Sequence, residues 1–350
     1  MKRTIALLLS LLLALSVFSA CDGSGASKEP EKPAEPTHID VLRVMFVPSH
    51  DPDEILRTTE PLKETLKNEL SGRGYDVGTV EISVGNSYED VGEALSAGKA
   101  DVAIGMPGGT YVQYETGCDV ILTSTRNGLS KDYDNAKDWN DEMPTVGVDI
   151  QTTFYRALLI AGHTETGMKL ANKVNAGQKL TWADIDSATW SIMSTSSSAG
   201  YIYPSLWLQE NYGKGVADLS HTVHSDSYDE AFRCLASGEV DALMTYADAR
   251  RDYSEAWNKE FGREESIWGD TNVIGVTSGI YNDTITVSKA SPIVDDAFKT
   301  ALQDSFIHIA ENTETGKAVI AIYNHKGYQK AVSSDYDNER AAQALMRSLG

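Results

Sequence analysis

An uncharged run of hydroxyl side chains stands out in this acidic chain. Every residue from Ser194 to Ser198 is Ser or Thr, and the run is followed by Ala199 and the apolar stretch GYIYPSLWLQ. A helix that begins here would offer unpaired backbone N–H groups and a partial positive charge beside the hydroxyls. Such a group binds a tetrahedral oxyanion without Arg or Lys. The alternative is a serine-rich turn that only caps the helix, and the residue types alone leave both interpretations open.

The elements expected around this run place it where ligands of α/β proteins bind. TWSIMS is a predicted strand that ends at the run, and AGYIYPSLWLQENYG is a predicted helix that follows it. From residue 39 onward, apolar segments such as IDVLRVMFV and ADVAIG alternate with helical patterns, which predicts parallel sheets flanked by helices. In such sheets ligands bind at the carboxyl ends of the strands. The loops after RVMFV, DVAIG and WSIM are therefore expected to form the binding site.

The same α/β unit occurs twice along the chain. SYEDVGEALSAGKADVAIG and SYDEAFRCLASGEVDALMT both run from Ser-Tyr-acid through an amphipathic helix and a glycine to a strand. We therefore predict an α/β fold of the periplasmic-binding-protein type with two lobes, each a mixed, mostly parallel sheet flanked by helices, and a ligand cleft between them. Lobe I is expected to comprise residues 39–155 plus 276–350, and lobe II residues 156–275.

The N-terminus predicts export. Lys2 and Arg3 precede the apolar run TIALLLSLLLALSVF, which is too short for a comfortable bilayer span and marks residues 1–20 as a signal peptide. Its end, VFSAC, resembles a bacterial lipobox, in which Cys21 becomes the lipidated first residue; cleavage by an ordinary signal peptidase is the alternative. Residues 21–38 are expected to include a flexible tether. The sequence thus predicts a lipoprotein held on the outer face of a bacterial cell membrane.

Charge and cysteine content indicate which kinds of partner and cofactor the protein is not expected to bind. The chain has a net charge of −21, and loss of the signal peptide removes Lys2 and Arg3 but no acid, which gives −23. Such a surface repels nucleic acid and anionic lipid. Cys118 and Cys234 are expected to be two separate buried thiols, because a disulfide between two lobes would block their movement. Neither a CxxC motif nor a Cys/His cluster with zinc spacing occurs, and we expect no metal and no cofactor.

The sequence argues against an enzyme. No G-x-S-x-G and no H-E-x-x-H occurs, and the histidines nearest to the serine run, His221 and His224, are distant in sequence. The segment GEALSAGKA imitates a phosphate-binding P-loop, but it has one residue too many between its glycines and lies at the end of a predicted helix.

Several segments resemble the phosphate/phosphite/phosphonate-binding proteins of ABC transporters. STSSSAGYIYP is similar to the Ser-Thr-Ser-Gly-aromatic loop of that family, and LRVMFVPSHDPDEI to its first strand and Pro-containing loop. The two duplicated helix–strand units follow in the order that the family has. After them come two segments that resemble its return strand and C-terminal region, TSGIYNDTITVSK and AIYNHKGYQKAVSSDYDNER. The resemblance covers nearly the whole mature chain. It implies a monomeric binding protein that captures a small phosphonate-type oxyanion by lobe closure and delivers it to a membrane permease.

The resemblance also implies ligand roles for matching residues. Ser197, Ser198 and the backbone N–H of Ala199 would hold the oxyanion, with Tyr88 and Tyr155 closing on the ligand. Tyr228 stands where the family usually has a His that reaches the oxyanion. Asp248 and Asp283 match carboxylates that face the ammonium group of an aminoalkylphosphonate. Structural alternatives are side-chain packing for the two helix-start tyrosines, pairing of Asp248 with Arg250 or Arg251, and a turn role for Asp283.

Departures from the family pattern leave the ligand open. Ala199 replaces the last hydroxyl of the loop, Tyr228 removes a possible cationic contact, Tyr281 stands where a Pro is usual, and GMPGG differs from the usual first-lobe loop. Phosphate, phosphite or an unrelated small ligand are therefore alternatives to a phosphonate. A ligand sensor that serves a membrane signalling partner is the alternative to transport.

Overall fold

The computed structural model describes residues 35–49, 52–323 and 325–349, and residues 36–350 form one compact unit. The predicted signal peptide, Cys21 and nearly all of the predicted tether lie outside the described residues. Within the described part of the chain, no helix is both long and apolar enough to cross a membrane.

The first sheet is built around the strand β1 (Thr37–Phe46), which pairs in parallel with β2 (Tyr75–Val84) and β3 (Val102–Met106). Leu42, Val44 and Phe46 are buried, as the apolar sequence predicts for a central strand. The other strands pair antiparallel, so the expectation of a mostly parallel sheet is wrong here. Strand direction changes because β13 enters the sheet on the chain's way back from the second lobe. These antiparallel pairs involve β4 (Cys118–Leu129), β5 (Gly147–Thr152), β13 (Thr284–Ser288) and β14 (Gly327–Lys330), of which β4 runs in the same direction as β1, β2 and β3.

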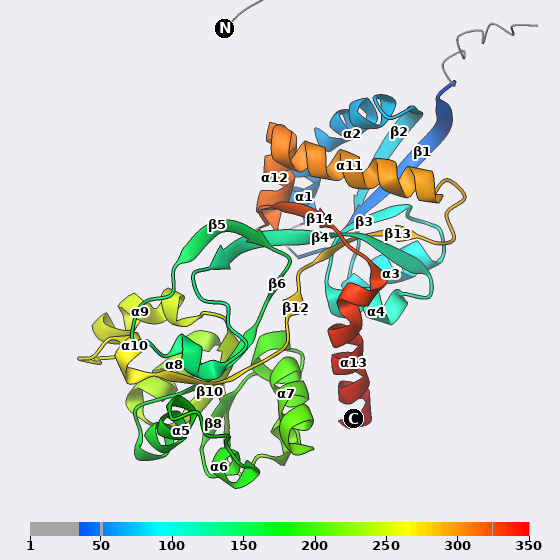
Figure 1. The fold of residues 1–350 in the computed structure, drawn as a ribbon. Helices are drawn as coiled ribbons and strands as arrows, with labels where there is room; N and C mark the ends of the chain where they lie inside the picture. The colour runs from blue at the N-terminus through cyan, green and yellow to red at the C-terminus, as the bar shows by residue number, and fades with distance from the viewer. Residues whose placement is uncertain (1–34, 50–51, 324, 350) are drawn as a thin grey trace, which may run out of the picture. The chain divides into compact units, whose positions relative to one another are not determined.

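Helices cover both faces of this sheet around one hydrophobic core. Figure 1 shows α2, α11 and α12 on one side, and α3 and α4 on the other. The helices are α1 (Pro52–Thr59), α2 (Leu62–Ser71), α3 (Tyr88–Ser96), α4 (Gly108–Tyr114), α11 (Asp296–Asn312) and α12 (Glu314–Ile322).

The second sheet has the order β11-β7-β10-β8-β9 and mixes parallel with antiparallel pairs. Separate hydrophobic clusters, one around Trp257 and one around Trp190, pack against it. Its strands are β7 (Ala157–Ala161), β8 (Trp190–Ile192), β9 (Thr222–His224), β10 (Ala242–Tyr246) and β11 (Asn272–Val276). The associated helices are α5 (Glu165–Asn175), α6 (Trp182–Asp186), α7 (Tyr203–Tyr212), α8 (Tyr228–Ser237), α9 (Arg250–Lys259) and α10 (Ile267–Asp270).

Several segments connect the two sheets. β6 (Phe154–Tyr155) and β12 (Ile280–Tyr281) pair antiparallel as a two-stranded ribbon, and Figure 1 shows both running between the two halves. The segment between β4 and β5 was expected in lobe I. Its residue Trp139, however, packs with Leu158 and Val273 in the core of the second sheet. The C-terminal helix α13 (Asp337–Leu349) follows β14 and contributes Ala342 to a cluster with Tyr203 at the start of α7. The lobe bounds themselves stay a prediction.

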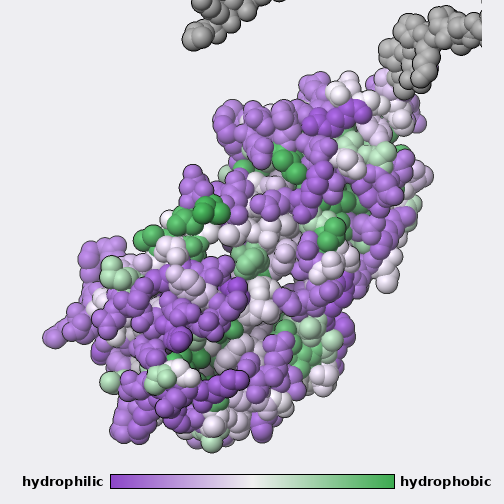
Figure 2. Space-filling model, viewed as in Figure 1, coloured by the Kyte–Doolittle hydropathy of each residue, from purple (hydrophilic) through white to green (hydrophobic). Residues whose placement is uncertain are grey.

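The structure can be compared with two sequence-based expectations, a hydrophilic surface and two separate buried thiols. The visible face is largely hydrophilic, and hydrophobic surface gathers near β5, where Val146 and Ile150 are exposed (Figure 2). Cys118 and Cys234 are free, in strand β4 and helix α8, which confirms two separate thiols. Cys118 is buried, whereas Cys234 is only partly buried.

Candidate functional site

The serine run connects β8 to a helical start, as predicted. Ser197 has extended backbone angles and its Oγ accepts a 3.1 Å hydrogen bond from the backbone N–H of Gly200. A π-helical turn over Ser198–Ile202 then leads into α7. Gly200 is required here, because a Cβ atom would lie 2.3 Å from Cγ of Met193. The hydroxyl of Ser197 therefore caps this turn, and Ser198 stands half-buried at its first residue.

The two helix-start tyrosines lie at equivalent places in the duplicated unit. Ser87 caps α3 by accepting a hydrogen bond from Asp90 N, and Ser227 caps α8 by accepting one from Glu230 N. Tyr88 and Tyr228 are the first residues of these helices. The glycines after both helices, Gly98 and Gly238, have φ values of +68° and +79°, which favour glycine. The predicted repeat therefore places one tyrosine on each half of the protein.

Tyr228 lies beside the serine loop. Its hydroxyl is 3.3 Å from Oγ of Ser197, and its ring packs edge-on against Tyr246 with centroids 5.1 Å apart. Burial raises the pKa of Tyr228, and the hydrogen bond with Ser197 partly offsets that shift. The hydroxyl stays protonated near neutral pH and can donate a hydrogen bond to an oxyanion.

Two neighbouring cavities share Arg126, Tyr155 and Ser198 in their linings. We call them the arginine compartment, of about 450 Å³, and the carboxylate compartment, of about 640 Å³. Tyr155 belongs to the connecting strand β6, and burial raises the pKa of its hydroxyl. Both volumes fall in the range of small-molecule sites.

The arginine compartment contains the serine-loop residues and three guanidinium groups. Arg126 lies in β4, Arg156 is the residue between β6 and β7, and Arg251 lies in the first turn of α9. The sequence-based hypothesis of an anion site without Arg or Lys missed them, because their positions along the chain are far apart. Lining residues that had been predicted from the sequence are Tyr155, Ser197, Ser198, Ala199 and Tyr228.

The carboxylate compartment brings Tyr88 and Asp283 together with Glu89 and Glu339. Burial raises the pKa of Tyr88, and the negative charges of Asp283 and Glu89 raise it further. Oδ2 of Asp283 lies 3.1 Å from Nε2 of His325, a buried ring behind the cavity wall. Asp283 therefore has both a cavity-facing position and a fixed orientation, which is more than the turn role that sequence alone allows.

Glu339 is a site residue that sequence reasoning did not find. It lies in the first turn of α13 and is only 7% exposed. Its two carboxylate oxygens accept hydrogen bonds from the Tyr203 hydroxyl at 2.8 Å and from Nε2 of Gln343 at 3.0 Å. No cation pairs with it among the residues that the structure describes. The GMPGG loop allows this approach, since a Cβ atom on Gly109 would lie 3.0 Å from Oε1 of Glu339.

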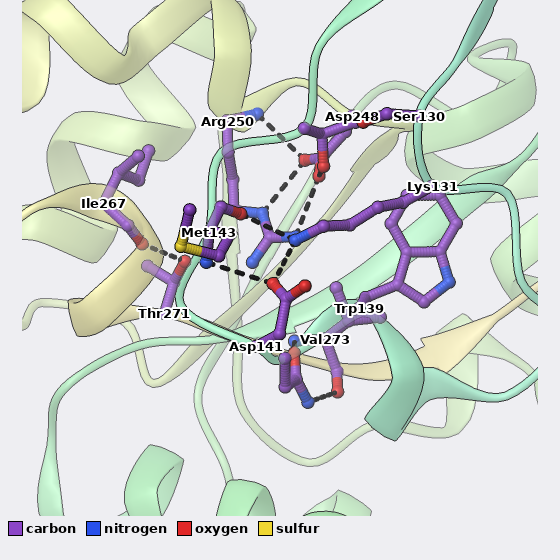
Figure 3. Close-up of polar contacts among 12 residues, drawn as sticks. Ser130, Lys131, Trp139, Asp141, Met143, Asp248, Arg250, Ile267, Thr271 and Val273 are labelled. Atoms are coloured by element: carbon purple, nitrogen blue, oxygen red, sulfur yellow. Dashed lines mark hydrogen bonds and ion pairs between the residues drawn. The ribbon is translucent and has the colours of Figure 1, made fainter.

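Asp248 lies elsewhere. Its side chain is buried and forms a paired contact with Arg250, with Nε–Oδ1 at 3.0 Å and Nη2–Oδ2 at 2.8 Å. Thr145 donates a further 2.8 Å hydrogen bond to Oδ2. Figure 3 shows Asp248 and Arg250 facing one another, close to the contact of Lys131 with Asp141 and with the carbonyl of Met143. Asp248 lines neither compartment, so these cavities do not support its expected place in the ligand site, which stays a prediction. The pair with Arg250 was the structural alternative, although it is buried instead of solvated.

The mixed sheets, the connecting strands and the cleft define a two-lobed binding protein of the periplasmic type. Solved structures share this fold. The Mycoplasma hyorhinis protein Mh-p37, described as a candidate thiamine pyrophosphate transporter, is 16% identical over 90% of this chain and 99% of that one, with a TM-score of 0.58. A Xanthomonas citri protein bound to ATP is 13% identical over 89% and 98%, with a TM-score of 0.55. PhnD1 of Prochlorococcus marinus, in complex with methylphosphonate, superposes less closely, at 14% identity over 88% and 98% with a TM-score of 0.46, and the shared fold rests on the first two structures.

A family model identifies the chain more closely. The model described as "ABC transporter, phosphonate, periplasmic substrate-binding protein" matches residues 44–336, and the chain belongs to that family. This confirms the resemblance noted in the sequence and places the protein in a family of transport components that bind a small molecule for a membrane permease. No curated protein matches the chain.

Proposed function

We propose that the protein captures an aminoalkylphosphonate in the cleft and presents it to the permease of an ABC importer. One observation carries this proposal: the two compartments that meet at Arg126, Tyr155 and Ser198 have linings of opposite charge. A zwitterion with its phosphonate on the arginine side and its ammonium on the carboxylate side would match both linings.

The phosphonate end would lie on the serine loop. Ser198, the backbone N–H of Ala199 and the Tyr228 hydroxyl are donors, and Ser197 orients them by capping the turn. Arg126 would add a charged donor from the facing strand β4. A hydrogen bond to a charged group contributes about 1.5–3 kcal/mol. Several such bonds, offset by desolvation and closure, would support roughly micromolar binding, or about −8 kcal/mol.

The ammonium end would lie between Glu339 and Asp283. A buried carboxylate without a cationic partner is unfavourable, and an ammonium group from the ligand would supply that partner. This argument gives Glu339 the role that the family resemblance had suggested for Asp248. Tyr88, exposed at the start of α3, would close over the ligand from the first lobe.

Ligand contacts from both lobes would favour a closed state. Arg126, Tyr88 and Asp283 come from elements of the first sheet and its helices, whereas Ser198 and Tyr228 come from elements of the second. Closure about the β6 and β12 connections would then depend on occupancy. We further propose that the mature chain is a monomer anchored through lipidated Cys21. A signalling partner in the membrane is the alternative receiver of the closed state.

Calorimetric titration of the soluble chain that begins at Asp22, without the lipid-bearing Cys21, tests the ligand class. We expect 2-aminoethylphosphonate to bind at least about tenfold more tightly than ethylphosphonate, which has the same carbon chain without the amine. Equal binding of the two would remove the amine from the proposal and leave a phosphonate or phosphate site. Absence of binding by any phosphonate, in a chain shown to be folded by circular dichroism, would overturn the proposed function.

A further inference from the structure

The arginine compartment holds more positive charge than its serine loop needs. Arg156 is neutralised, because Asp132 and Asp134 lie 2.6 and 2.8 Å from its guanidinium and the carbonyl of Thr277 accepts from it at 3.1 Å. Arg126 and Arg251, in contrast, have no ion-pair partner in the described ranges of the chain. In a strongly acidic protein, two uncompensated guanidinium groups at one cavity point to an anionic ligand.

Arg251 lines the same cavity as the serine loop but comes from a different element. It is the second residue of α9, and its Nη2 lies 3.3 Å from the position that a Cβ atom on Gly147 of β5 would take. A cation in the first turn of a helix opposes the helix dipole, so helix stability does not explain it. The adjacent Arg250 is paired with Asp248, whereas Arg251 lines the cavity together with Tyr246 and Phe154.

We propose that the natural ligand carries a second acidic group, a carboxylate or a phosphoryl group, which Arg251 binds while the phosphonate occupies the serine loop. This inference rests on the proposed function and adds a substrate class to it. A guanidinium group binds either kind of acid through two parallel hydrogen bonds. Phe154, Tyr228 and Tyr246 line the same cavity, and Arg251 is exposed there, so its guanidinium group is free to reach a ligand acid.

The test compares ligands that differ only in the second acid. Phosphonoacetate carries a carboxylate, methylenediphosphonate carries a second phosphoryl group, and the control 2-hydroxyethylphosphonate carries an uncharged hydroxyl group in place of the second acid. Calorimetric titration of the mature chain should show at least one of the two acids binding about tenfold or more tightly than the control. Because the two acids are titrated separately, the experiment also shows whether a carboxylate or a second phosphoryl group is preferred.

Variants assign that gain to Arg251. Arg251→Gln should bring the ratio between the acid and the hydroxyethyl control close to one, and Arg251→Lys should restore part of it. Arg57→Gln removes the same charge from α1, at a residue that belongs to neither lining, and should keep the wild-type ratio. A gain that is absent in the wild type, or that persists in Arg251→Gln, would overturn the inference. If 2-aminoethylphosphonate or methylphosphonate still binds in that case, the proposed function stands without it.

Discussion

The hydroxyl of Tyr203 donates a 2.8 Å hydrogen bond to Oε2 of Glu339, and this bond joins the start of α7 to the first turn of α13. Burial raises the pKa of Tyr203, and the charge of Glu339 raises it further, so the tyrosine keeps the proton that it donates. The contact holds a buried carboxylate at the wall of the carboxylate compartment. The C-terminal helix therefore contributes directly to the proposed ligand site.

Replacement of Glu339 by Gln should reduce the preference for an amine-bearing ligand. The substitution keeps the size and an acceptor for Tyr203 but removes the charge that would pair with an ammonium group. We expect the affinity ratio of 2-aminoethylphosphonate to ethylphosphonate to fall about tenfold or more, measured by calorimetry. Glu311→Gln, at an exposed site on α11, is the charge-matched control. An unchanged ratio in Glu339→Gln would exclude Glu339 from amine recognition.

Removal of the two facing contacts should abolish phosphonate binding without unfolding the protein. Ser198→Ala together with Tyr88→Ala takes away one hydroxyl from the serine loop and the ring that would close from the other lobe. Both side chains are at least partly exposed, so the far-ultraviolet circular dichroism and the melting temperature should stay near those of the wild type. Ser194→Ala together with Tyr133→Ala is the control, since neither residue lines the cleft. Wild-type affinity in the cleft variant would refute the site assignment.

Features set by local pattern could be predicted from the sequence. The serine loop, the caps at Ser87 and Ser227, and the paired positions of Tyr88 and Tyr228 all follow from short motifs and helix periodicity. These signals act within a few residues of the chain. The family resemblance extended them to the fold and to the connecting Tyr155, which lines both compartments.

Features set by contacts between distant segments were missed. Arg126 on β4 and Glu339 on α13 reach the cleft only because several strands and a helix return across the two sheets. The antiparallel pairing of β13 has the same origin. Asp248 shows a different limit: an acid next to an arginine suits either a ligand site or an ion pair, and the buried pair with Arg250, which sequence does not give, favours the ion pair.

The Asp248–Arg250 pair should matter for stability instead of ligand binding. Removal of one partner from a buried ion pair leaves an uncompensated charge and typically destabilises a protein by about 3–5 kcal/mol. We expect Asp248→Asn to lower the free energy of unfolding in urea by about that amount, with Asp226→Asn, a highly exposed acid, close to the wild type. Ligand affinity of the folded Asp248→Asn protein should not change. A loss of affinity with unchanged stability would return Asp248 to the ligand site.

The two thiols should differ sharply in reactivity. Burial raises the pKa of Cys118 to about 12, and the thiol donates a 3.2 Å hydrogen bond to the carbonyl of Tyr114. Because the thiolate is the reactive form, Cys118 should resist maleimide labelling at pH 8 until the protein unfolds. Cys234 is only partly buried, and although burial raises its pKa too, it should label first. Mass spectrometry of the soluble chain that begins at Asp22 should therefore show one adduct under native conditions and two in urea. Labelling of Cys118 first, or failure of both to label in urea because they form a disulfide, would contradict the arrangement of separate thiols in β4 and α8.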